Sequence, residues 1–513
     1  MGTKRQSNFE DLIDFTRASG GTALRPVSYG SELVTNGTFD TDTSGWTDGS
    51  TGTGSISWAS GEISISRGAT SSDVGRADQS ISTEAGKVYF ISFAKTSGTG
   101  AISLFVGTSQ GGSQISSAVV ASDDGIYTLS FVAQSDTTWI ALRSSTNNAT
   151  ATIDNVSLTE VTFDEADGTL TLFEHPNNIP RIEYDSSGNR LGLLIEESRT
   201  NLLPYSANLA NWSGQYATVT SGYTAPDGSS DACLLSIPST ANDRITETVT
   251  ATSTSATLSV FVKAGPNSNG DFKILLRNAT TATNLFNTTL TITDGVAVNN
   301  GWYRHDLTAS SGITAGNSLI YYLYVDGANT VGSDNYFWGG QLEAGSFPTS
   351  YIPTSGATTT RSADVASIST DAFGYNQSAG SVVVEAQSKE VGVNRLYALT
   401  EDGGIQDAVY SYAGSSGHLI IRANNVTEAN IDAGTFVADT YSKLAATYKA
   451  NDSAVTIDGG TVQTDTSVNL PTTVNTMFFG ASSTTANHLN GHIKSIKYYP
   501  RRLTNAQLVE ITS

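Results

Sequence analysis

The chain has 513 residues, with 49 Gly and 11 Pro, and only 15% of its residues are charged. A single hydrophobic core rarely exceeds about 300 residues, so we expect two to four domains. The net charge of −21 repels nucleic-acid phosphates and anionic membranes, so neither nucleic-acid binding nor membrane insertion is expected. The longest apolar stretch, at residues 319–325, is also too short to span a bilayer.

The cysteine content and the N-terminus bear on where the protein works. Cys233 is the single cysteine, so no intrachain disulfide is expected. The opening sequence MGTKRQSNFEDLIDF has neither the apolar segment nor the cleavage site of a Sec signal, so we expect no such signal. A protein that works outside a cell without one must leave by lysis or another route.

Helices are predicted only near the two ends of the chain. Asn8 precedes two acidic residues, as an N-cap precedes the first turn of a helix, and this predicts a helix from Asn8 to Phe15. Thr504 would cap a second helix, from Thr504 to Ile511, in the same way. One apolar face supports this second helix, formed by Leu503, Leu508 and Ile511.

Elsewhere, short alternating or apolar runs recur between clusters of Gly, Asn, Asp and Ser. This pattern predicts strands over residues 55–58, 63–66, 88–93, 257–262, 273–276, 381–385, 443–448 and 454–457. Turns are predicted at 451–452 and 458–460, where Asp-Gly is a strong hairpin signal. Strands without interleaved helices favour antiparallel sandwiches.

Two long segments look like variants of one module. The first opens with VTNGTFD at residue 34 and closes with TIDNVSL at residue 158, whereas the second opens with RTNLL at residue 199 and closes with YFWGGQLE at residue 343. Each has an Asn and then a Trp near its start, an acidic residue in its last strand, and the length of one sandwich. Three tryptophans are expected in the cores: Trp46, Trp212 and Trp338.

Several of these strings carry a family resemblance. VTNGTF (34–39) with Trp46, and IDNVSL (153–158), resemble the start and end of carbohydrate-binding jelly-roll modules. The tail, LNGHIK (489–494) through YYPRRLT (498–504), resembles the end of laminin-G or concanavalin-A-like sandwiches. These resemblances imply a fold more than a ligand.

Four further strings resemble, in this order, strings of phage spike and tail-fibre proteins. They are DFTRAS (14–19), PRIEYD (180–185), GLLIEESRTNL (192–202) and GQLEAG (340–345) with PTSYIPT (348–354). In that family the first string lies close to the second, whereas here about 130 residues intervene, the length of one sandwich. We therefore expect the first module to be inserted, and the opening segment to pack against residues 163–200.

The predicted fold class is all-β, with three antiparallel β-sandwich (jelly-roll) domains in tandem and a short N-terminal arm. The predicted divisions are an attachment arm (1–31), an inserted jelly roll (32–160), a β connector (161–204), a second jelly roll (205–355), a linker (356–372) and a laminin-G or concanavalin-A-like sandwich (373–513).

The jelly-roll resemblance implies a structural Ca²⁺ between the first and last strands. Ca²⁺ takes about six to eight oxygen ligands and accepts backbone carbonyls beside a carboxylate. The matching positions are Asn36, Thr38 and Asp154, and, by the internal repeat, Asn201 and Glu343. The alternative is that these acidic residues cap a strand or bind a turn.

Sugar binding requires exposed aromatic rings with planar polar groups nearby. The candidates are Trp58, Arg67, Arg76, Trp139, Tyr223 and Trp302. Each aromatic residue could instead belong to a core. The modules could also be structural units that bind no sugar.

Catalytic patterns are weak. The adjacent carboxylate pairs are Asp123–Asp124, Glu196–Glu197 and Glu401–Asp402. A glycosidase needs two carboxylates facing one bond, whereas adjacent residues of a strand point to opposite faces. The sequence contains no His-Glu-x-x-His, and we expect no enzyme activity and no cofactor other than Ca²⁺.

The resemblance implies a bacteriophage virion-surface protein, a head or tail fibre or spike, assembled in the host cytoplasm and released by lysis. Its N-terminal arm, with Lys4 and Arg5, would dock onto other virion structural proteins. Its expected ligands are bacterial surface glycans for host attachment, and its expected oligomer is a homotrimer, in which multivalency offsets weak single sites. The alternatives are a purely structural decoration or connector protein, and a polysaccharide-degrading enzyme with accessory modules.

Overall fold

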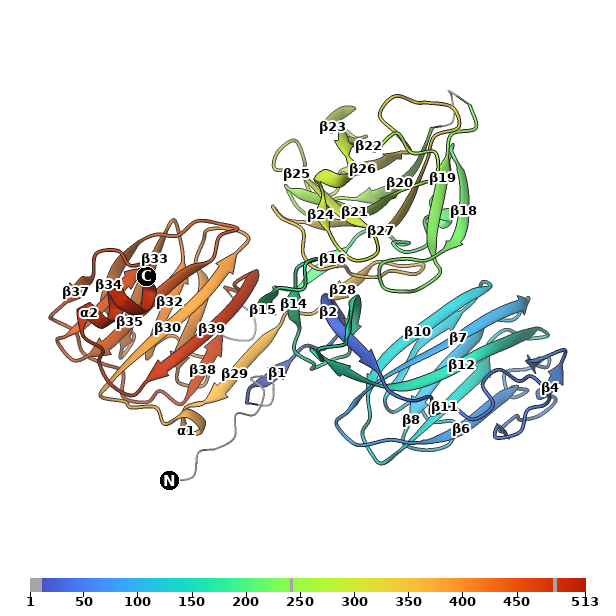
Figure 1. The fold of residues 1–513 in the computed structure, drawn as a ribbon, viewed down its shortest axis with the longest axis horizontal. Coiled ribbons are helices and arrows are strands. Elements are labelled where there is room, and N and C mark those ends of the chain that lie inside the picture. Colours follow the sequence, from blue (N-terminus) through green and yellow to red (C-terminus); the bar gives the residue numbers. More distant parts are fainter. Residues whose placement is uncertain (1–11, 240–242, 483–486) are drawn as a thin grey trace.

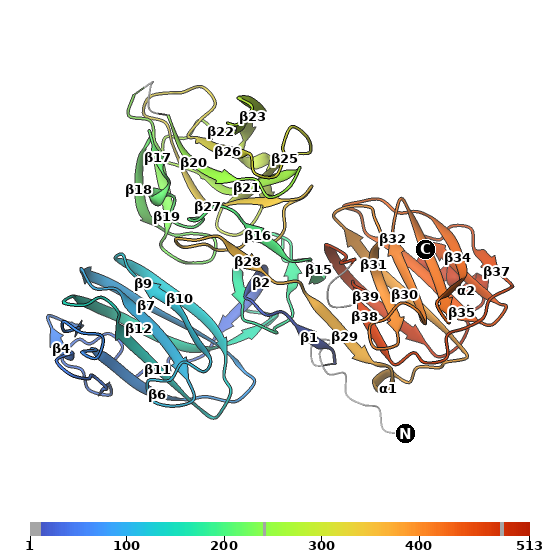
Figure 2. The same cartoon turned by 180° about the vertical axis from the view of Figure 1, so that it is seen from behind.

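The structure, a computed structural model, describes residues 12–239, 243–482 and 487–513 (Figure 1). Most of its regular elements are strands of antiparallel sheets, which confirms the predicted all-β class. The sheets stack into three sandwiches that meet around β2 (Gly21–Tyr29), β14 (Ile182–Tyr184), β15 (Arg190–Ile195), β16 (Arg199–Asn201) and β28 (Thr359–Arg361), as Figures 1 and 2 show. Each of the eight predicted strands lies within an observed strand.

The first sandwich packs two sheets around a core that includes Ile63, Phe93, Leu104 and Ile140. One sheet has the order β10-β7-β12-β2-β13, with β5 on β12 and β4 on β5. Its strands are β2 (Gly21–Tyr29), β4 (Ser55–Ala59), β5 (Glu62–Ser66), β7 (Val88–Gly98), β10 (Gly125–Val132), β12 (Thr150–Phe163) and β13 (Thr169–His175). The other sheet has the order β3 (Thr47–Asp48), β6 (Arg76–Ser82), β11 (Thr137–Ser144), β8 (Ile102–Gly107) and β9 (Ser116–Ala121).

The second sandwich has a core that includes Trp212, Ile274, Tyr321 and Phe337. One sheet has the order β18 (Thr218–Tyr223), β19 (Ala232–Ser236), β27 (Asp334–Ala344), β21 (Ala256–Ala264), β25 (Tyr303–Ala309) and β24 (Val296–Ala297). The other has the order β17 (Gly214–Gln215), β20 (Arg244–Thr250), β26 (Ser318–Tyr324), β22 (Asp271–Asn278) and β23 (Thr283–Thr291). Two 3₁₀ turns, η2 (Leu209–Asn211) and η3 (Ile292–Asp294), each bury one residue, Leu209 and Ile292, in this core.

The third sandwich consists of two seven-stranded sheets. The first has the order β1 (Asp14–Thr16), β29 (Val365–Ser369), β38 (Thr476–Phe479), β31 (Asn394–Thr400), β32 (Ala408–Ala413), β33 (Ser416–Ala423) and β34 (Val426–Thr435). The second has the order β14 (Ile182–Tyr184), β15 (Arg190–Ile195), β39 (Gly491–Tyr499), β30 (Ala379–Ser388), β35 (Ser442–Lys449), β36 (Ser453–Ile457) and β37 (Gln463–Asp465). The short helix α1 (Thr370–Phe373) follows β29.

The third sandwich is discontinuous in sequence, because the other two are inserted into it. In β1, Phe15 lies opposite Ala366 of β29, and in β15, Leu194 lies opposite His492 of β39. The first sandwich therefore interrupts the chain between β1 and β14, and the second interrupts it between β15 and β29. Strands β16 (Arg199–Asn201) and β28 (Thr359–Arg361) pair where the chain enters and leaves the second sandwich. The chain thus makes four passages between the third sandwich and the inserted ones.

Three predictions at the edges of the domains are wrong. In the described part of the predicted 8–15 helix, Leu12 and Ile13 form a turn that leads into strand β1, and Ile13 and Phe15 are buried in the third sandwich. Asn8 lies outside the described residues. The described part of the predicted 1–31 arm is not a separate arm, because β1 and β2 belong to two different sandwiches. The predicted 356–372 linker contains β28 and β29.

The predicted C-terminal helix is confirmed as α2 (Asn505–Thr512). Thr504 Oγ1 accepts a hydrogen bond from the Gln507 backbone N–H, and the Gln507 side chain accepts one from the Thr504 N–H, which completes a capping box. The apolar face buries Leu508 against the third sandwich. Among the described residues, no helix is long and apolar enough to cross a membrane.

Candidate functional site

Five buried charged side chains meet where the four chain passages converge. We call this set the ionic node: Arg17, Arg181, Glu196, Arg361 and Asp364. Arg181 Nη2 lies 2.7 Å from Glu196 Oε2 and also donates to Asp364. Arg17 Nη1 lies 3.2 Å from Asp364 Oδ1, and Arg361 Nη2 lies 3.5 Å from Glu196 Oε2. Each of the four passages therefore contributes at least one charge.

The strings that carry the phage resemblance converge on this node. DFTRAS supplies Arg17, PRIEYD supplies Arg181 and GLLIEESRTNL supplies Glu196. PTSYIPT supplies Ser350, whose backbone N–H and hydroxyl each donate to Glu196 at 2.7 Å. These side chains link the three sandwiches through buried ion pairs and hydrogen bonds, so their role is structural.

Burial and neighbouring charges shift the pKa values of Glu196 and Arg17 in the node. Burial alone would raise the pKa of Glu196, but Arg361 and Arg181, with the Ser350 hydrogen bonds, outweigh it and hold that pKa well below its usual range. Burial, and next the charge of Arg181, lower the pKa of Arg17 to about 10 against the opposing effect of Asp364. Glu196 and Arg17 are therefore charged at neutral pH.

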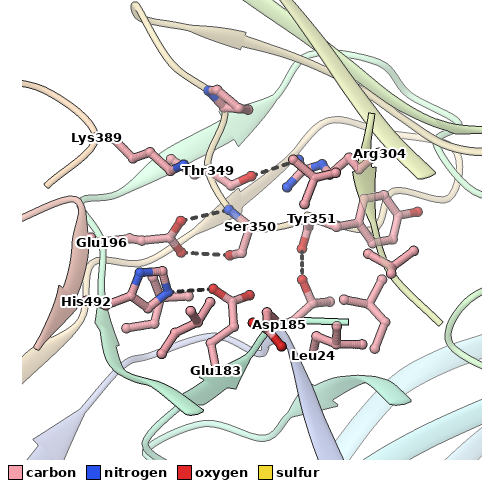
Figure 3. A pocket seen from close by; sticks show the side chains of 18 of the residues that line it. Leu24, Glu183, Asp185, Glu196, Arg304, Thr349, Ser350, Tyr351, Lys389 and His492 are labelled. Atoms are coloured by element: carbon pink, nitrogen blue, oxygen red, sulfur yellow. Dashed lines mark hydrogen bonds and ion pairs between the residues drawn. The ribbon is translucent and has the colours of Figure 1, made fainter. Parts of the chain in front are cut away.

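A cavity of about 370 Å³ lies beside the node, between the three sandwiches (Figure 3). Its walls come from β2, β14, β15, β25, β39 and the segment at 347–351. His492 Nε2 lies 2.6 Å from Glu183 Oε2, and Arg304 Nη2 donates to Ser259 Oγ at 2.9 Å and to the Thr349 carbonyl at 2.8 Å. The first of these contacts lies within the third sandwich and the others lie within the second, so these polar groups already have partners inside their own sandwich.

A different surface brings together two of the predicted sugar-binding residues, Arg76 and Trp139, with Arg67 at its edge. Along β11, Ile140 and Leu142 face the core of the first sandwich, so Trp139, Ala141 and Arg143 face outward. Across the neighbouring strands, Arg143 lies opposite Arg76 and Ser103, Ala141 opposite Asp78 and Phe105, and Trp139 opposite Ser80 and Gly107. We call the surface formed by Arg76, Asp78, Phe105, Trp139 and Arg143 the outer face.

The outer face combines half-buried rings with a planar polar network. Trp139, Phe105, Arg76 and Arg143 are all half-buried. Asp78 is buried beneath them and accepts hydrogen bonds from Arg76 Nε and Gln110 Nε2, each at 3.0 Å. In Figures 1 and 2, β6 and β11 lie on the side of the first sandwich that is turned away from the second. The second sandwich therefore does not cover this face.

Arginine charges accumulate at one end of the outer face. Arg67 is fixed at the end of β11, since its Nη1 donates to the Ser144 carbonyl at 2.9 Å and its Nη2 to the Ser71 carbonyl at 3.1 Å. The Arg143 guanidinium lies 5.5 Å from the centre of the Phe105 ring. Burial, followed by the charges of Arg67 and Arg76, lowers the pKa of Arg143.

The sequence pointed to Trp139, Arg76 and Arg67 on this surface but missed Asp78, Phe105 and Arg143. The signal for Arg143 was present, because residues 139, 141 and 143 share one face of any strand through TTWIALRS. Phe105 and Asp78 depend on which strands are neighbours, and that pairing comes from the tertiary structure.

The other aromatic candidates lie elsewhere. Trp58 is 45% exposed on the hairpin of β4 and β5, where its indole N–H donates to the Phe39 carbonyl at 2.6 Å. Tyr223 is half-buried in the second sandwich, with its ring centre 5.0 Å from that of Tyr336. The prediction for Trp302 is wrong, because its side chain is only 1% exposed and packs in an apolar cluster beneath the cavity. The core prediction for Trp46, Trp212 and Trp338 is confirmed.

The segments that carry the first predicted Ca²⁺ set are neighbours in the first sandwich, although the Asn36 side chain donates to Asp42 and Ser44 and the Thr38 hydroxyl donates to Asp40. The Val156 N–H donates to the Gly37 carbonyl at 2.9 Å, which places the segment of Asn36 and Thr38 beside that of Asp154. Asp154 accepts hydrogen bonds from the backbone and side chain of Asn155. Within the described ranges, no group of three or more His, Cys, Asp or Glu side chains is arranged to hold a metal ion.

The second predicted Ca²⁺ set does not fit a metal. Asn201 is fully buried, accepts from the Leu203 and Leu342 N–H groups at 3.1 Å, and donates to the Gly340 and Ile352 carbonyls. Glu343 is also fully buried, and its two oxygens accept from Thr349 and Gln341. Burial raises the pKa of Glu343, which disfavours the anion that Ca²⁺ would need. Both residues instead tie the two ends of the second sandwich together.

Two carboxylates share one hydroxyl at the seam between the first and second sandwiches. Ser229 Oγ lies 2.7 Å from Asp227 Oδ1 and also contacts Asp231 Oδ1. Because a hydroxyl carries one hydrogen, it can donate to only one of them, and the other contact needs a protonated carboxyl. Burial, and next the charge of Asp231, raise the pKa of Asp227 to about 7, with Glu174 of β13 adding a smaller effect. This seam therefore titrates near neutral pH.

No protein-family model matches the chain, and no curated protein matches its sequence. Among solved structures, the chain is similar to the CBM40 of a Ruminococcus gnavus IT-sialidase bound to α2,6-sialyllactose, with 14% identity and a TM-score of 0.24 over 27% of this chain and 85% of that one. It is similar to a tandem CBM22 pair from Paenibacillus barcinonensis, with 14% identity and a TM-score of 0.20 over 63% and 100%. It is also similar to the LG4-5 domains of mouse laminin α1, with 9% identity and a TM-score of 0.21 over 61% and 93%. TM-scores this low carry no argument about what this chain binds.

Proposed function

We propose that this chain is a non-catalytic glycan-binding protein and that the outer face of the first sandwich is its binding site. One observation carries the proposal: Trp139 and Phe105 lie on the same sheet face as Arg76, Asp78 and Arg143. Sugar C–H groups pack on aromatic rings, and sugar hydroxyls hydrogen-bond to planar guanidinium and carboxylate groups. The buried pairing of Asp78 with Arg76 holds this polar network in place before a ligand arrives.

Binding of the intact chain to an array of neutral and acidic glycans tests the proposal. Trp139→Ala should weaken capture by about tenfold or more, because it removes the larger ring of the face. Tyr216→Ala, which truncates a 47% exposed ring in the second sandwich, is the matched control and should leave capture unchanged. If Trp58→Ala loses glycan capture and Trp139→Ala does not, the binding site lies on the β4–β5 hairpin and not on the outer face. Failure to capture any glycan would reject the function.

A place on the surface of a phage particle is a further part of the proposal, supported by the ordered strings DFTRAS, PRIEYD, GLLIEESRTNL and PTSYIPT. Attachment through the N-terminus is tested by a truncation that stops at residue 11, since a longer one would remove Ile13, Phe15 and Arg17 from the third sandwich and the node. Normal incorporation of the truncated chain into particles would reject attachment through this segment. The mass of the isolated protein in solution tests the proposed trimer.

The ionic node favours a second candidate function, that of a structural connector. A buried node joining four chain passages fixes three sandwiches relative to one another, which a spacer between particle components requires. A connector would remain bound to its neighbours in the particle when the outer face is disabled by Trp139→Ala and would capture no glycan in the wild type. The glycan array therefore separates the two functions.

A further inference from the structure

We infer that the outer face selects a sugar acid, whose carboxylate would bind to Arg143 at the arginine-rich end while its ring packs on Phe105 and Trp139. This inference rests on the proposed glycan-binding function of the same face. It adds the chemical class of the ligand, which is an acidic polysaccharide and not a neutral one.

The arrangement of Arg143 and Arg76 is the first argument. These residues lie directly opposite each other on neighbouring strands, and Arg143 has no carboxylate partner among the described residues. Like charges placed directly opposite each other in a sheet are destabilising. An anion between the two guanidinium groups would turn this unfavourable pair into a binding site.

The second argument is that the charged groups next to Arg143 already have hydrogen-bond partners. Asp78 is occupied by Arg76 and Gln110, and Arg67 is occupied by two backbone carbonyls. Among the described residues, Asp78 is the carboxylate that forms an ion pair with one of the three arginines, which leaves surplus positive charge on Arg67 and Arg143 at this end of the face. The lowered pKa of Arg143, caused by burial and then by Arg67 and Arg76, reports the same surplus.

The contrast with the rest of the molecule is the third argument. The chain carries a net charge of −21, so it repels acidic polymers as a whole, and a local surplus of positive charge is the feature that can capture one. Guanidinium groups match carboxylates with two parallel hydrogen bonds, which gives orientation as well as affinity.

The geometry along β11 fits a chain of sugars. Trp139 and Arg143 are four residues apart on one face, which is about 13 Å in a strand. Phe105 lies opposite Ala141, between these two positions on the neighbouring strand. A polysaccharide running along β11 can therefore place one sugar on the rings and the acidic group of a neighbouring sugar at Arg143.

Matched pairs of polymers test the inference. Polygalacturonate, alginate and polysialic acid are each compared with their carboxyl-reduced forms, which keep the sugar rings and remove the charge. The intact chain should bind at least one acidic polymer about tenfold more tightly than its reduced form, as expected for one charge-assisted hydrogen bond. The preference should shrink as salt is raised.

Two variants identify the groups responsible. Arg143→Gln should remove the preference for the acidic form and leave binding to the reduced form unchanged. Arg190→Gln removes the same charge from an exposed position on β15 and controls for the overall field of the protein. Trp139→Ala should weaken binding to both forms.

The outcomes separate the two proposals. Equal binding of acidic and reduced forms, still lost in Trp139→Ala, overturns the sugar-acid inference and leaves the glycan-binding function standing. Capture of only the neutral glycans on the array would likewise overturn the sugar-acid inference and leave the glycan-binding function standing. A preference for the acidic form that survives Arg143→Gln overturns the assignment to this arginine. Absence of binding to every polymer and every array member overturns both.

Discussion

The Arg17 guanidinium lies 3.2 Å from the Asp364 carboxylate, both side chains are fully buried, and 347 residues separate them in the sequence. This contact links the first chain passage to the last. It belongs to the ionic node, where the two inserted sandwiches are fastened to the third. The node therefore sets how the outer face of the first sandwich is presented relative to the rest of the molecule.

Removing one partner of the node should destabilise the fold strongly. Arg181→Ala leaves Glu196 and Asp364 buried with less compensating charge, and we expect a loss of about 3–5 kcal/mol in the free energy of unfolding. Lys389→Ala breaks an exposed pair with Asp439 and should cost less than about 1 kcal/mol. Denaturant unfolding followed by circular dichroism measures both. Equal losses in the two variants would contradict the assignment of the node as a fastening.

The node should also weaken in acid. The folded-state pKa of Glu196 is held below its usual value, so its stabilisation is present above the unfolded-state pKa of about 4.3 and is lost as the pH falls towards the folded-state pKa. Glu196→Gln should be less stable than the wild type at neutral pH and lose less stability between about pH 5 and 3. Denaturant midpoints across this range provide the measurement. Parallel curves for the two proteins would show that Glu196 does not contribute to the acid response.

The seam at Asp227 should respond to pH in the opposite direction. Its folded-state pKa is raised to about 7, so the folded state binds the proton more tightly than the unfolded state does, and stability falls as the pH rises from the unfolded-state pKa through 7. Asp227→Asn mimics the protonated form and should stabilise the protein at about pH 8 by about 1 kcal/mol or more. Its melting temperature should vary less than that of the wild type between pH 5 and 8. A lower melting temperature for the variant at pH 8 would refute a protonated Asp227.

Calcium remains a prediction for the first sandwich alone. If Asn36, Thr38 and Asp154 hold a Ca²⁺ ion, EDTA should lower the melting temperature, added Ca²⁺ should restore it, and Asp154→Ala should abolish the response. Glu343→Gln should leave the response intact, because Glu343 is engaged by Thr349 and Gln341. A melting temperature unmoved by EDTA and by Ca²⁺ would end the calcium hypothesis.

The outer face shows which residues of a binding site can be predicted from the sequence and which cannot. Alternation along TTWIALRS places Trp139 and Arg143 on one side of a strand whichever sheet contains it. Their neighbours Arg76 and Phe105 come from strands that are about 60 and 35 residues away, and side chains so distant meet only through sheet pairing. The same limit explains Trp302, whose aromatic character favoured a platform and whose burial depends on the packing of another sandwich.

The sequence by itself determined the all-β class, the eight predicted strands and the C-terminal helix, because alternation of apolar residues and helix capping are local properties. Only the tertiary structure decided that Ile13 and Phe15 complete a sandwich more than 350 residues further along the chain, and that four distant chain passages meet in one ionic node. The desolvation cost of a buried charge is offset only where oppositely charged and hydrogen-bonding groups surround it, and no local sequence pattern specifies those groups.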